Sequence, residues 1–187
     1  LVVYQQVENN LIERSNRGRW RTQPQSGAIK ITRSRNIVIR NNVVRDAERG
    51  NLIWMDVAVI KPSVYNNSLD GSSSFPNQWA DSGICYEESD GGYPPNLSLI
   101  VGNTVLNCHK SIVVCAGGRC IVGWNTISSK WSTTSGPQAI LILQDRDIAV
   151  DGAEAPIDEY LRWTIGVRVW SNFILPQEAG WQLLAYD

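Results

Sequence analysis

The sequence predicts an all-β solenoid of about six coils, in which short parallel strands stack along one axis. The first observation is a three-position set that occurs six times: an aliphatic residue, an Asn three residues later and another aliphatic residue two further on. The second is a series of short strand-like segments that follow Gly or another small residue between these sets. The third is the lack of any long helical periodicity in a chain rich in β-branched residues, Gly, Asn and Ser.

The recurring Asn predicts a ladder of side chains inside the solenoid. Where no insertion intervenes, one coil takes about 22 residues, from Asn103 to Asn125, which is too short to contain a helix. A side-chain amide both donates and accepts hydrogen bonds, so the Asn residues of successive coils can bond along the axis. The six sets are Val7–Asn10–Ile12, Ile39–Asn42–Val44, Val64–Asn67–Leu69, Ile100–Asn103–Val105, Val122–Asn125–Ile127 and Val169–Asn172–Ile174.

The strand segments alternate between apolar and polar residues with a period of two, which gives each strand an inner and an outer face. In the first segment Ile29 and Ile31 are expected to point inward, and Lys30 outward. The strand at residues 140–143, within the fifth segment, is apolar on both faces, which predicts that its outer side is covered. The segments lie at residues 26–34, 50–57, 82–89, 110–117, 135–145 and 179–187.

Insertions into the minimal coil predict protruding loops. In solenoids such insertions leave the stack and commonly build the binding surface. The lengthened spans run from Asn10 to Gly27, from Asn67 to Gly83, from Gly83 to Asn103 and from Gly136 to Asn172, the last of which holds the acidic stretch 145–162.

The length of 187 residues is enough for one domain with a sizeable core, and we assign residues 1–187 to a single β-helix-like unit. No stretch approaches the roughly 20 apolar residues of a membrane-spanning helix, so no membrane span is expected. The chain opens with a strand-like segment and no Met, which suggests a processed or truncated piece of a longer protein. We expect adjoining coils, another domain or another subunit to cap the open ends of the stack.

The charge distribution permits two interpretations of the basic part of the chain, and the cysteine content permits two states of the cysteines. Residues 1–50 carry ten Lys and Arg against four Asp and Glu, whereas residues 51–187 carry seven against fourteen. The basic part is either a face for an anionic partner or a set of solvated Arg side chains. Four cysteines, none in a C-x-x-C pair, and one His argue against a zinc site, and they permit either two disulfides or free buried thiols.

The alternation of a Gly–apolar strand with an aliphatic–x–x–Asn–x–aliphatic set resembles the right-handed parallel β-helix proteins, especially secreted bacterial β-helix repeat proteins. The resemblance covers residues 7–15, 26–69, 83–127 and 136–187. Proteins of this shape include pectate, alginate and chondroitin lyases, pectin esterases, polygalacturonases, phage tailspikes and surface proteins. The resemblance implies an extracellular or periplasmic protein with an elongated groove along one parallel sheet that binds polysaccharide. The aspartate clusters expected of a polygalacturonase are absent.

Outward positions of the strand segments supply the candidate catalytic groups. The alternation places Asp56 and Glu87 outside on adjacent coils, about 4.8 Å apart along the axis. Two carboxylates this close repel unless they share a proton or bind a cation, and either arrangement serves hydrolysis or lyase chemistry. Lys30 would then hold a carboxylate of the substrate, and Glu88 would complete a Ca²⁺ site with Asp56 and Glu87. Alternatively the carboxylates are solvated, or tied to Lys30 and Arg33.

Arginine and tryptophan supply the candidate substrate-binding groups. Arg forks suit carboxylate or sulfate groups, and an indole face suits a sugar ring, so the basic loop at residues 14–21 suggests a subsite for an acidic polysaccharide. The small size of this basic cluster argues against nucleic acid. We expect Trp124, Trp163, Trp170 and Trp181 to pack under loops or to cap the stack. The candidates are Arg17, Arg19, Trp20, Arg21, Trp54, Trp79 and Arg146.

These expectations favour an extracellular carbohydrate-active protein, a lyase or hydrolase that acts on an acidic polysaccharide. The alternative is a non-catalytic glycan-binding, adhesive or tail-fibre-type β-helix, and a third hypothesis is a structural spacer. No motif identifies the substrate.

Overall fold

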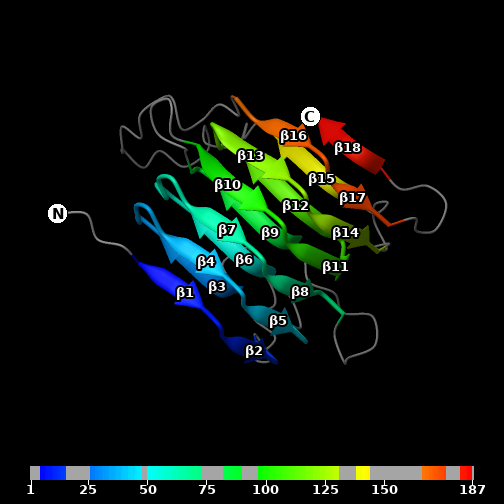
Figure 1. The fold of residues 1–187 in the computed structure, drawn as a ribbon, viewed down its shortest axis with the longest axis horizontal. Helices are drawn as coiled ribbons and strands as arrows, with labels where there is room; N and C mark the ends of the chain where they lie inside the picture. Colours follow the sequence, from blue (N-terminus) through cyan, green and yellow to red (C-terminus); the bar gives the residue numbers. More distant parts are fainter. Residues whose placement is uncertain are drawn as a thin grey trace, which may run out of the picture.

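The structure is a computed structural model that describes residues 5–15, 26–47, 50–72, 82–89, 97–130, 138–143 and 166–175, and the backbone of 182–186. These residues form a parallel β-helix, as the sequence predicts (Figure 1). Each turn of the chain contributes one short strand to each of three six-stranded parallel sheets, and no helix occurs within the described ranges.

The three sheets, here called A, B and C, follow one another along every coil. Sheet A contains β1 (Gln6–Glu8), β4 (Val38–Arg40), β7 (Ser63–Tyr65), β10 (Ser98–Val101), β13 (Cys120–Gly123) and β16 (Arg168–Trp170). Sheet B contains β2 (Leu11–Glu13), β5 (Val43–Arg45), β8 (Ser68–Asp70), β11 (Thr104–Cys108), β14 (Thr126–Ser129) and β17 (Phe173–Ile174). Sheet C contains β3 (Gly27–Thr32), β6 (Asn51–Asp56), β9 (Ser82–Glu87), β12 (Lys110–Cys115), β15 (Gln138–Leu143) and β18 (Gln182–Tyr186).

The core lies between the sheets and is built from the inward positions that the sequence indicates. In sheet A the aliphatic residues before each ladder Asn are register partners of one another from coil to coil. Those of the middle coils are fully buried, namely Ile39, Val64, Ile100 and Val122. Burial of such a side chain contributes about 1.5–3 kcal/mol relative to exposure, so these rows of aliphatic residues drive the stacking.

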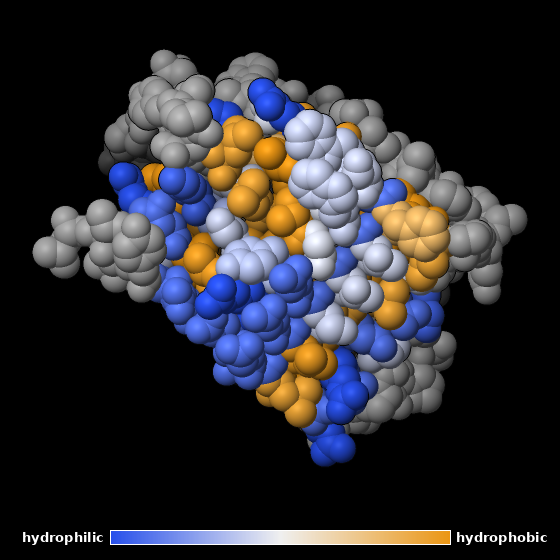
Figure 2. All heavy atoms as spheres, viewed as in Figure 1, coloured by the Kyte–Doolittle hydropathy of each residue, from blue (hydrophilic) through white to orange (hydrophobic). Residues whose placement is uncertain are grey.

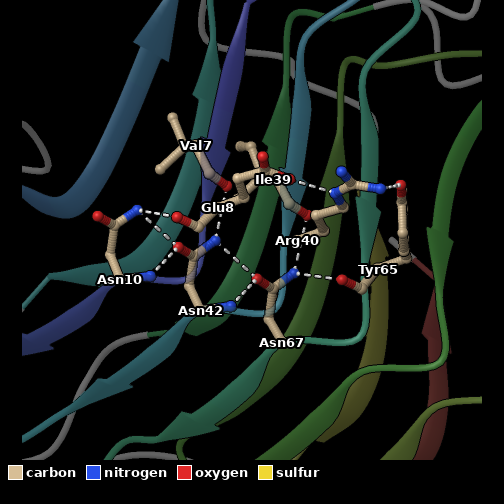
Figure 3. Close-up of polar contacts among 8 residues, drawn as sticks. All are labelled: Val7, Glu8, Asn10, Ile39, Arg40, Asn42, Tyr65 and Asn67. Atoms are coloured by element: carbon tan, nitrogen blue, oxygen red, sulfur yellow. Dashed lines mark hydrogen bonds and ion pairs between the residues drawn. The ribbon is translucent and has the colours of Figure 1, made fainter.

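The predicted Asn ladder is present at the corner between sheets A and B (Figure 3). Asn42 donates to the Oδ1 atom of Asn67 through both its backbone N–H and its Nδ2 atom, at 3.0 Å each. One Nδ2 hydrogen of Asn67 bonds to Oδ1 of Asn103 in the next coil, and the other bonds to the backbone oxygen of Ile39 in the preceding coil at 3.0 Å. The same pattern continues through Asn103 and Asn125, so the buried amides are satisfied by one another and by the backbone.

The residue before each ladder Asn has a left-handed backbone conformation. Asn41 and Asn66 have a φ of 55°, and Gly102 has a φ of 65°. Gly and Asn are the residues that adopt this conformation at least cost, which explains their presence at these corners. The fifth and sixth coils depart from this rule, because Trp124 and Ser171 occupy the same position with a φ of 53° and 50°.

Candidate functional site

Four of the residues predicted for the site lie together on the outer face of sheet C. Lys30 on β3 and Trp54 on β6 are register partners, and Asp56 follows Trp54 by two residues on the same face. Glu87 lies on β9, the strand that pairs with β6 on its other side. Three successive coils therefore contribute to one cluster, here called the Lys30 cluster: Lys30, Trp54, Asp56 and Glu87.

Direct contacts link the members of the Lys30 cluster. The Nζ atom of Lys30 lies 2.8 Å from Oδ2 of Asp56 and 3.6 Å from the ring centroid of Trp54. The indole N–H of Trp54 donates to Oε2 of Glu87 at 2.8 Å. For Asp56 the sequence left open either a catalytic or cation-binding role or an ion pair with Lys30, and the structure contains this ion pair. The side chains of Lys30 and Asp56 keep 27% and 14% of their surface exposed, so solvent can reach this pair.

Trp54 is only 4% exposed and offers no accessible ring face for a sugar. Its indole belongs to a row of buried side chains on the outer face of sheet C, with Cys85, Val113 and Leu141 as the other members. This row is separate from the main core, which lies on the inner face of the same sheet. The outer side of the strand at residues 140–143 is thus covered, as its two apolar faces predict.

The four cysteines are free thiols, which decides between the two alternatives for them. Burial raises the pKa of the Cys85 thiol well above its ordinary value, and the nearby carboxylate of Glu87 adds to this effect. Burial likewise raises the pKa of Cys108. Both thiols are therefore protonated at neutral pH and act as small apolar side chains.

In the part of the chain that the structure describes, no three His, Cys, Asp or Glu side chains are grouped so that they could hold a metal ion. Asp56, Glu87 and Glu88, the carboxylates for which the sequence suggests Ca²⁺, are all within this part. The remaining candidates lie outside the described residues, namely Arg17, Arg19, Trp20, Arg21, Trp79 and Arg146.

A second surface lies on the outer face of sheet A, and the sequence did not predict it. Trp124 and Trp170 are 59% and 45% exposed, so the expectation that they pack under loops or cap the stack is wrong. Their ring centroids are 5.7 Å apart and their planes are inclined by 53°. Two large indoles therefore present a joint surface to solvent at the fifth and sixth coils.

The backbone places both indoles. Trp170 on β16 is the register partner of Gly123 on β13, and a Cβ atom added to Gly123 would lie 2.7 Å from Cδ1 and Nε1 of the Trp170 ring. The missing side chain thus lets the indole lie close against the sheet. Trp124 holds the left-handed corner position, which costs roughly 1–2 kcal/mol for a residue with a Cβ atom.

The indole pair continues into a row of apolar side chains along the sheet. Val101 is the register partner of Gly123, and Leu99 is the register partner of Ile121. The side chains of Leu99, Val101 and Ile121 are all partly accessible. Figure 2 shows apolar residues gathered over β10 and β13 on the side of the molecule that sheet A forms. We call this surface the sheet A platform and define it by Leu99, Val101, Ile121, Trp124, Arg168 and Trp170.

Arg168 gives the sheet A platform a positive charge. It lies two residues before Trp170 on β16 and therefore on the same face, and it is exposed. Within the described ranges it forms no ion pair. The signal that could have revealed the platform is Trp124 itself, since a bulky residue precedes the ladder Asn where the other coils have Asn, Gly or Ser.

The described residues include no long apolar helix that could cross a membrane. No protein-family model matches the chain, and neither a search of curated proteins nor a search of solved structures finds a similar protein.

Proposed function

We propose that the protein is an extracellular or periplasmic carbohydrate-active β-helix that binds an acidic polysaccharide along the sheet A platform. The observation that carries this proposal is the pair of exposed indoles, Trp124 and Trp170. An indole buries a large apolar area against a partner and still carries one polar N–H group, which suits a sugar ring with its apolar faces and polar edges. An exposed apolar patch with polar neighbours is typical of an interaction surface.

The charge of the platform supports an acidic ligand. The guanidinium of Arg168 can form two parallel hydrogen bonds with a carboxylate or sulfate, and no carboxylate of the described residues occupies it. The platform also extends over several strands of a parallel sheet, which suits an extended polymer better than a compact ligand. The resemblance of the repeat to polysaccharide-binding β-helix proteins agrees with this choice.

We expect Trp170→Ala and Trp124→Ala each to weaken binding to a soluble uronate polymer about tenfold, because loss of one stacked ring removes roughly 1.4 kcal/mol. Arg168→Gln should weaken binding to the uronate polymer and leave binding to a neutral polysaccharide unchanged. Affinity electrophoresis or calorimetry with polygalacturonate, alginate and a neutral glucan measures these effects.

Phe173→Ala is the matched control for the loss of an exposed aromatic ring. Phe173 is 63% exposed, but it lies on β17 in sheet B and outside the platform. Wild-type affinity in Phe173→Ala together with reduced affinity in Trp170→Ala supports the platform. Equal affinities for wild type, Trp124→Ala and Trp170→Ala toward every polymer tested would remove the platform from consideration.

The Lys30 cluster supports cleavage of the polysaccharide as a second candidate function. It combines two carboxylates and an ammonium on one sheet face, which are the groups that lyases and glycosidases use for acid–base chemistry. A carboxylate of an acidic substrate would compete with Asp56 for Lys30 and thereby release Asp56 to act as a base. Glu87, already held by the indole N–H of Trp54, has a fixed position next to this pair.

For this candidate we expect Asp56→Asn or Glu87→Gln to abolish turnover while the far-UV circular dichroism spectrum stays unchanged. Turnover is measured both as new reducing ends, which report hydrolysis, and as absorbance of unsaturated products, which reports a lyase. Glu13→Gln is the control. Like Asp56, Glu13 is a carboxylate in an ion pair, here with Arg45, but it lies on sheet B and outside the Lys30 cluster. Full activity in both cluster variants rejects the site, and binding without any product leaves a non-catalytic glycan-binding protein.

A further inference from the structure

One outward row of sheet A connects the sheet A platform with an ion pair on β1 and β4. Each member of this row is the register partner of the next. Neighbouring strands are spaced by about 4.8 Å, so Arg40 and Trp170, which are four strands apart, are separated by about 19 Å along the solenoid axis. The row consists of Glu8, Arg40, Tyr65, Val101, Gly123 and Trp170.

Direct contacts link the three residues at the end of the row opposite to Trp170 (Figure 3). Nε of Arg40 donates to Oε2 of Glu8 at 2.5 Å, and Nη1 of Arg40 donates to the hydroxyl oxygen of Tyr65 at 3.1 Å. The guanidinium carbon of Arg40 lies 6.0 Å from the ring centroid of Tyr65. The carboxylate and the phenol thus hold the guanidinium in place. We call Glu8, Arg40 and Tyr65 the Arg40 cluster.

The Arg40 cluster keeps polar atoms available to a ligand. The side chains of Arg40 and Glu8 are 36% and 29% exposed. Among the residues that the structure describes, Nη2 of Arg40 and Oε1 of Glu8 have no hydrogen-bond or ion-pair partner. The cluster therefore offers both a donor and an acceptor beside the partly accessible ring of Tyr65.

The two ends of the row differ in net charge. At the platform end, Arg168 is exposed and forms no ion pair with a described residue. At the other end, Glu8 balances the charge of Arg40. An acidic sugar is therefore favoured beside Arg168, whereas beside Arg40 its carboxylate would meet the like charge of Glu8.

A hydroxyl group suits the Arg40 cluster better than a carboxylate does. A hydroxyl both donates and accepts, so it can accept from Nη2 of Arg40 and donate to Oε1 of Glu8. A carboxylate only accepts, and it would have to displace Glu8 in order to pair fully with Arg40. Repulsion of the wrong ligand contributes to specificity as much as attraction of the right one.

The residues between the two ends of the row are small. Val101 is the register partner of Tyr65, and the next position is Gly123, against which the indole of Trp170 lies. The side chain of Val101 is shorter than either aromatic side chain. One extended polymer can therefore contact Tyr65 and Trp170 together, without a bulky side chain between them.

We propose that the Arg40 cluster is a second subsite of the sheet A platform, and that it binds a neutral, hydroxylated residue of the polymer whose acidic residue binds beside Arg168. The ligand is then a heteropolysaccharide that contains both kinds of sugar, rather than a polymer of uronates alone. This assignment rests on the proposed function, because it adds a contact to the same bound polymer.

Replacement of Glu8 tests the subsite. Glu8→Gln keeps an acceptor oxygen but removes the charge, so it no longer repels a carboxylate and it binds a hydroxyl more weakly. Hyaluronan, in which a uronate alternates with a neutral N-acetylated amino sugar, is the mixed probe, and polygalacturonate is the purely acidic probe. We expect Glu8→Gln to lower the ratio of hyaluronan affinity to polygalacturonate affinity about tenfold at equal chain length, as measured by calorimetry.

Glu13→Gln is the matched control, because Glu13 also pairs with an Arg but lies on sheet B, and it should leave the ratio unchanged. Arg40→Gln should weaken binding to polygalacturonate, since it leaves the charge of Glu8 without a partner. An unchanged ratio in Glu8→Gln, or an equal fall in Glu13→Gln, overturns the subsite. Tighter polygalacturonate binding by Arg40→Gln overturns it as well.

Trp170→Ala separates this inference from the proposed function. Reduced affinity of Trp170→Ala for both probes, together with an unchanged ratio in Glu8→Gln, retains the platform and rejects the Arg40 cluster. Failure of the wild type to bind any acidic polymer, hyaluronan and polygalacturonate included, rejects the proposed function and the subsite together.

Discussion

Replacement of Asn103 by Ala is expected to lower the free energy of unfolding by about 4 kcal/mol, near the upper end of the range for single substitutions. Oδ1 of Asn103 accepts from the backbone N–H and Nδ2 of Asn67, and its own Nδ2 donates to the backbone oxygen of Val64 at 3.0 Å. Asn67 and Asn103 are both 1% exposed, so water cannot replace the lost partners without local opening. Each buried polar group left unpaired costs about 1–3 kcal/mol, and the substitution would leave at least two donors and one acceptor in this state.

Asn10→Ala is the matched control, because it removes the same side chain from the exposed end of the same ladder. There only Asn42 and the backbone oxygen of Glu8 lose a bond, and Oδ1 of Asn42 still accepts from the backbone N–H of residue 10. Because Asn10 itself is exposed, water can enter the space that its side chain leaves, so we expect a loss of about 1 kcal/mol or less. Urea unfolding monitored by circular dichroism measures both variants. Equal losses at the two positions would show that buried amide pairing does not stabilise this fold.

Gly83→Ala is expected to destabilise the protein by about 3 kcal/mol through overpacking of the interior. A Cβ atom at Gly83 would lie 2.2 Å from Cγ1 of Val105 and 2.7 Å from the backbone oxygen of Ser111. Val105 is fully buried on β11, and Ser111 belongs to the paired strand β12, so neither neighbour can move without displacing a strand. Close packing of protein interiors leaves no free volume to absorb the extra methyl group.

Gly27→Ala tests whether this effect comes from the clash rather than from the loss of a glycine. Gly27 also lies in a sheet C strand, but a Cβ atom there would meet its nearest neighbour at 3.4 Å, an ordinary contact. We expect a change within about 0.5 kcal/mol for Gly27→Ala. Thermal unfolding of both variants, and of Gly83→Ala combined with Val105→Ala, measures the clash. A cost for Gly83→Ala that is unchanged by the second substitution would show that Val105 does not cause it.

Much of the fold could be predicted because its determinants repeat. Each coil must place an aliphatic residue, a left-handed corner and an Asn at equivalent positions, so the same short pattern occurs six times and strengthens the prediction each time. The period-two alternation within strands likewise places Ile53 and Met55 inside, and Lys30 and Asp56 outside, without knowledge of the partner strands. The corner pattern and the alternation depend on backbone conformation and on which face of a strand is buried, and residues a few positions apart are enough to show both.

The site could be predicted only in part, since side-chain partners and burial depend on the neighbouring coils and on what covers each face. Alternation placed Trp54 on an outer face, where the sequence suggested a sugar-binding ring, but the structure buries it in a row with Cys85 and Val113. Conversely, alternation within a strand shows which face a tryptophan lies on but not whether that face is covered, so it could not show that Trp124 and Trp170 are exposed on sheet A.

By itself the sequence determined the parallel β-helix, the inner and outer faces of its strands and the ladder of Asn residues. Only the tertiary structure decided that Lys30 pairs with Asp56, that the four thiols stay free, and that the indoles of Trp124 and Trp170 meet. The physical reason is one of range. Backbone conformation and alternation are set by residues a few positions apart, whereas the indole pair joins residues 46 positions apart, a separation that an insertion between them determines.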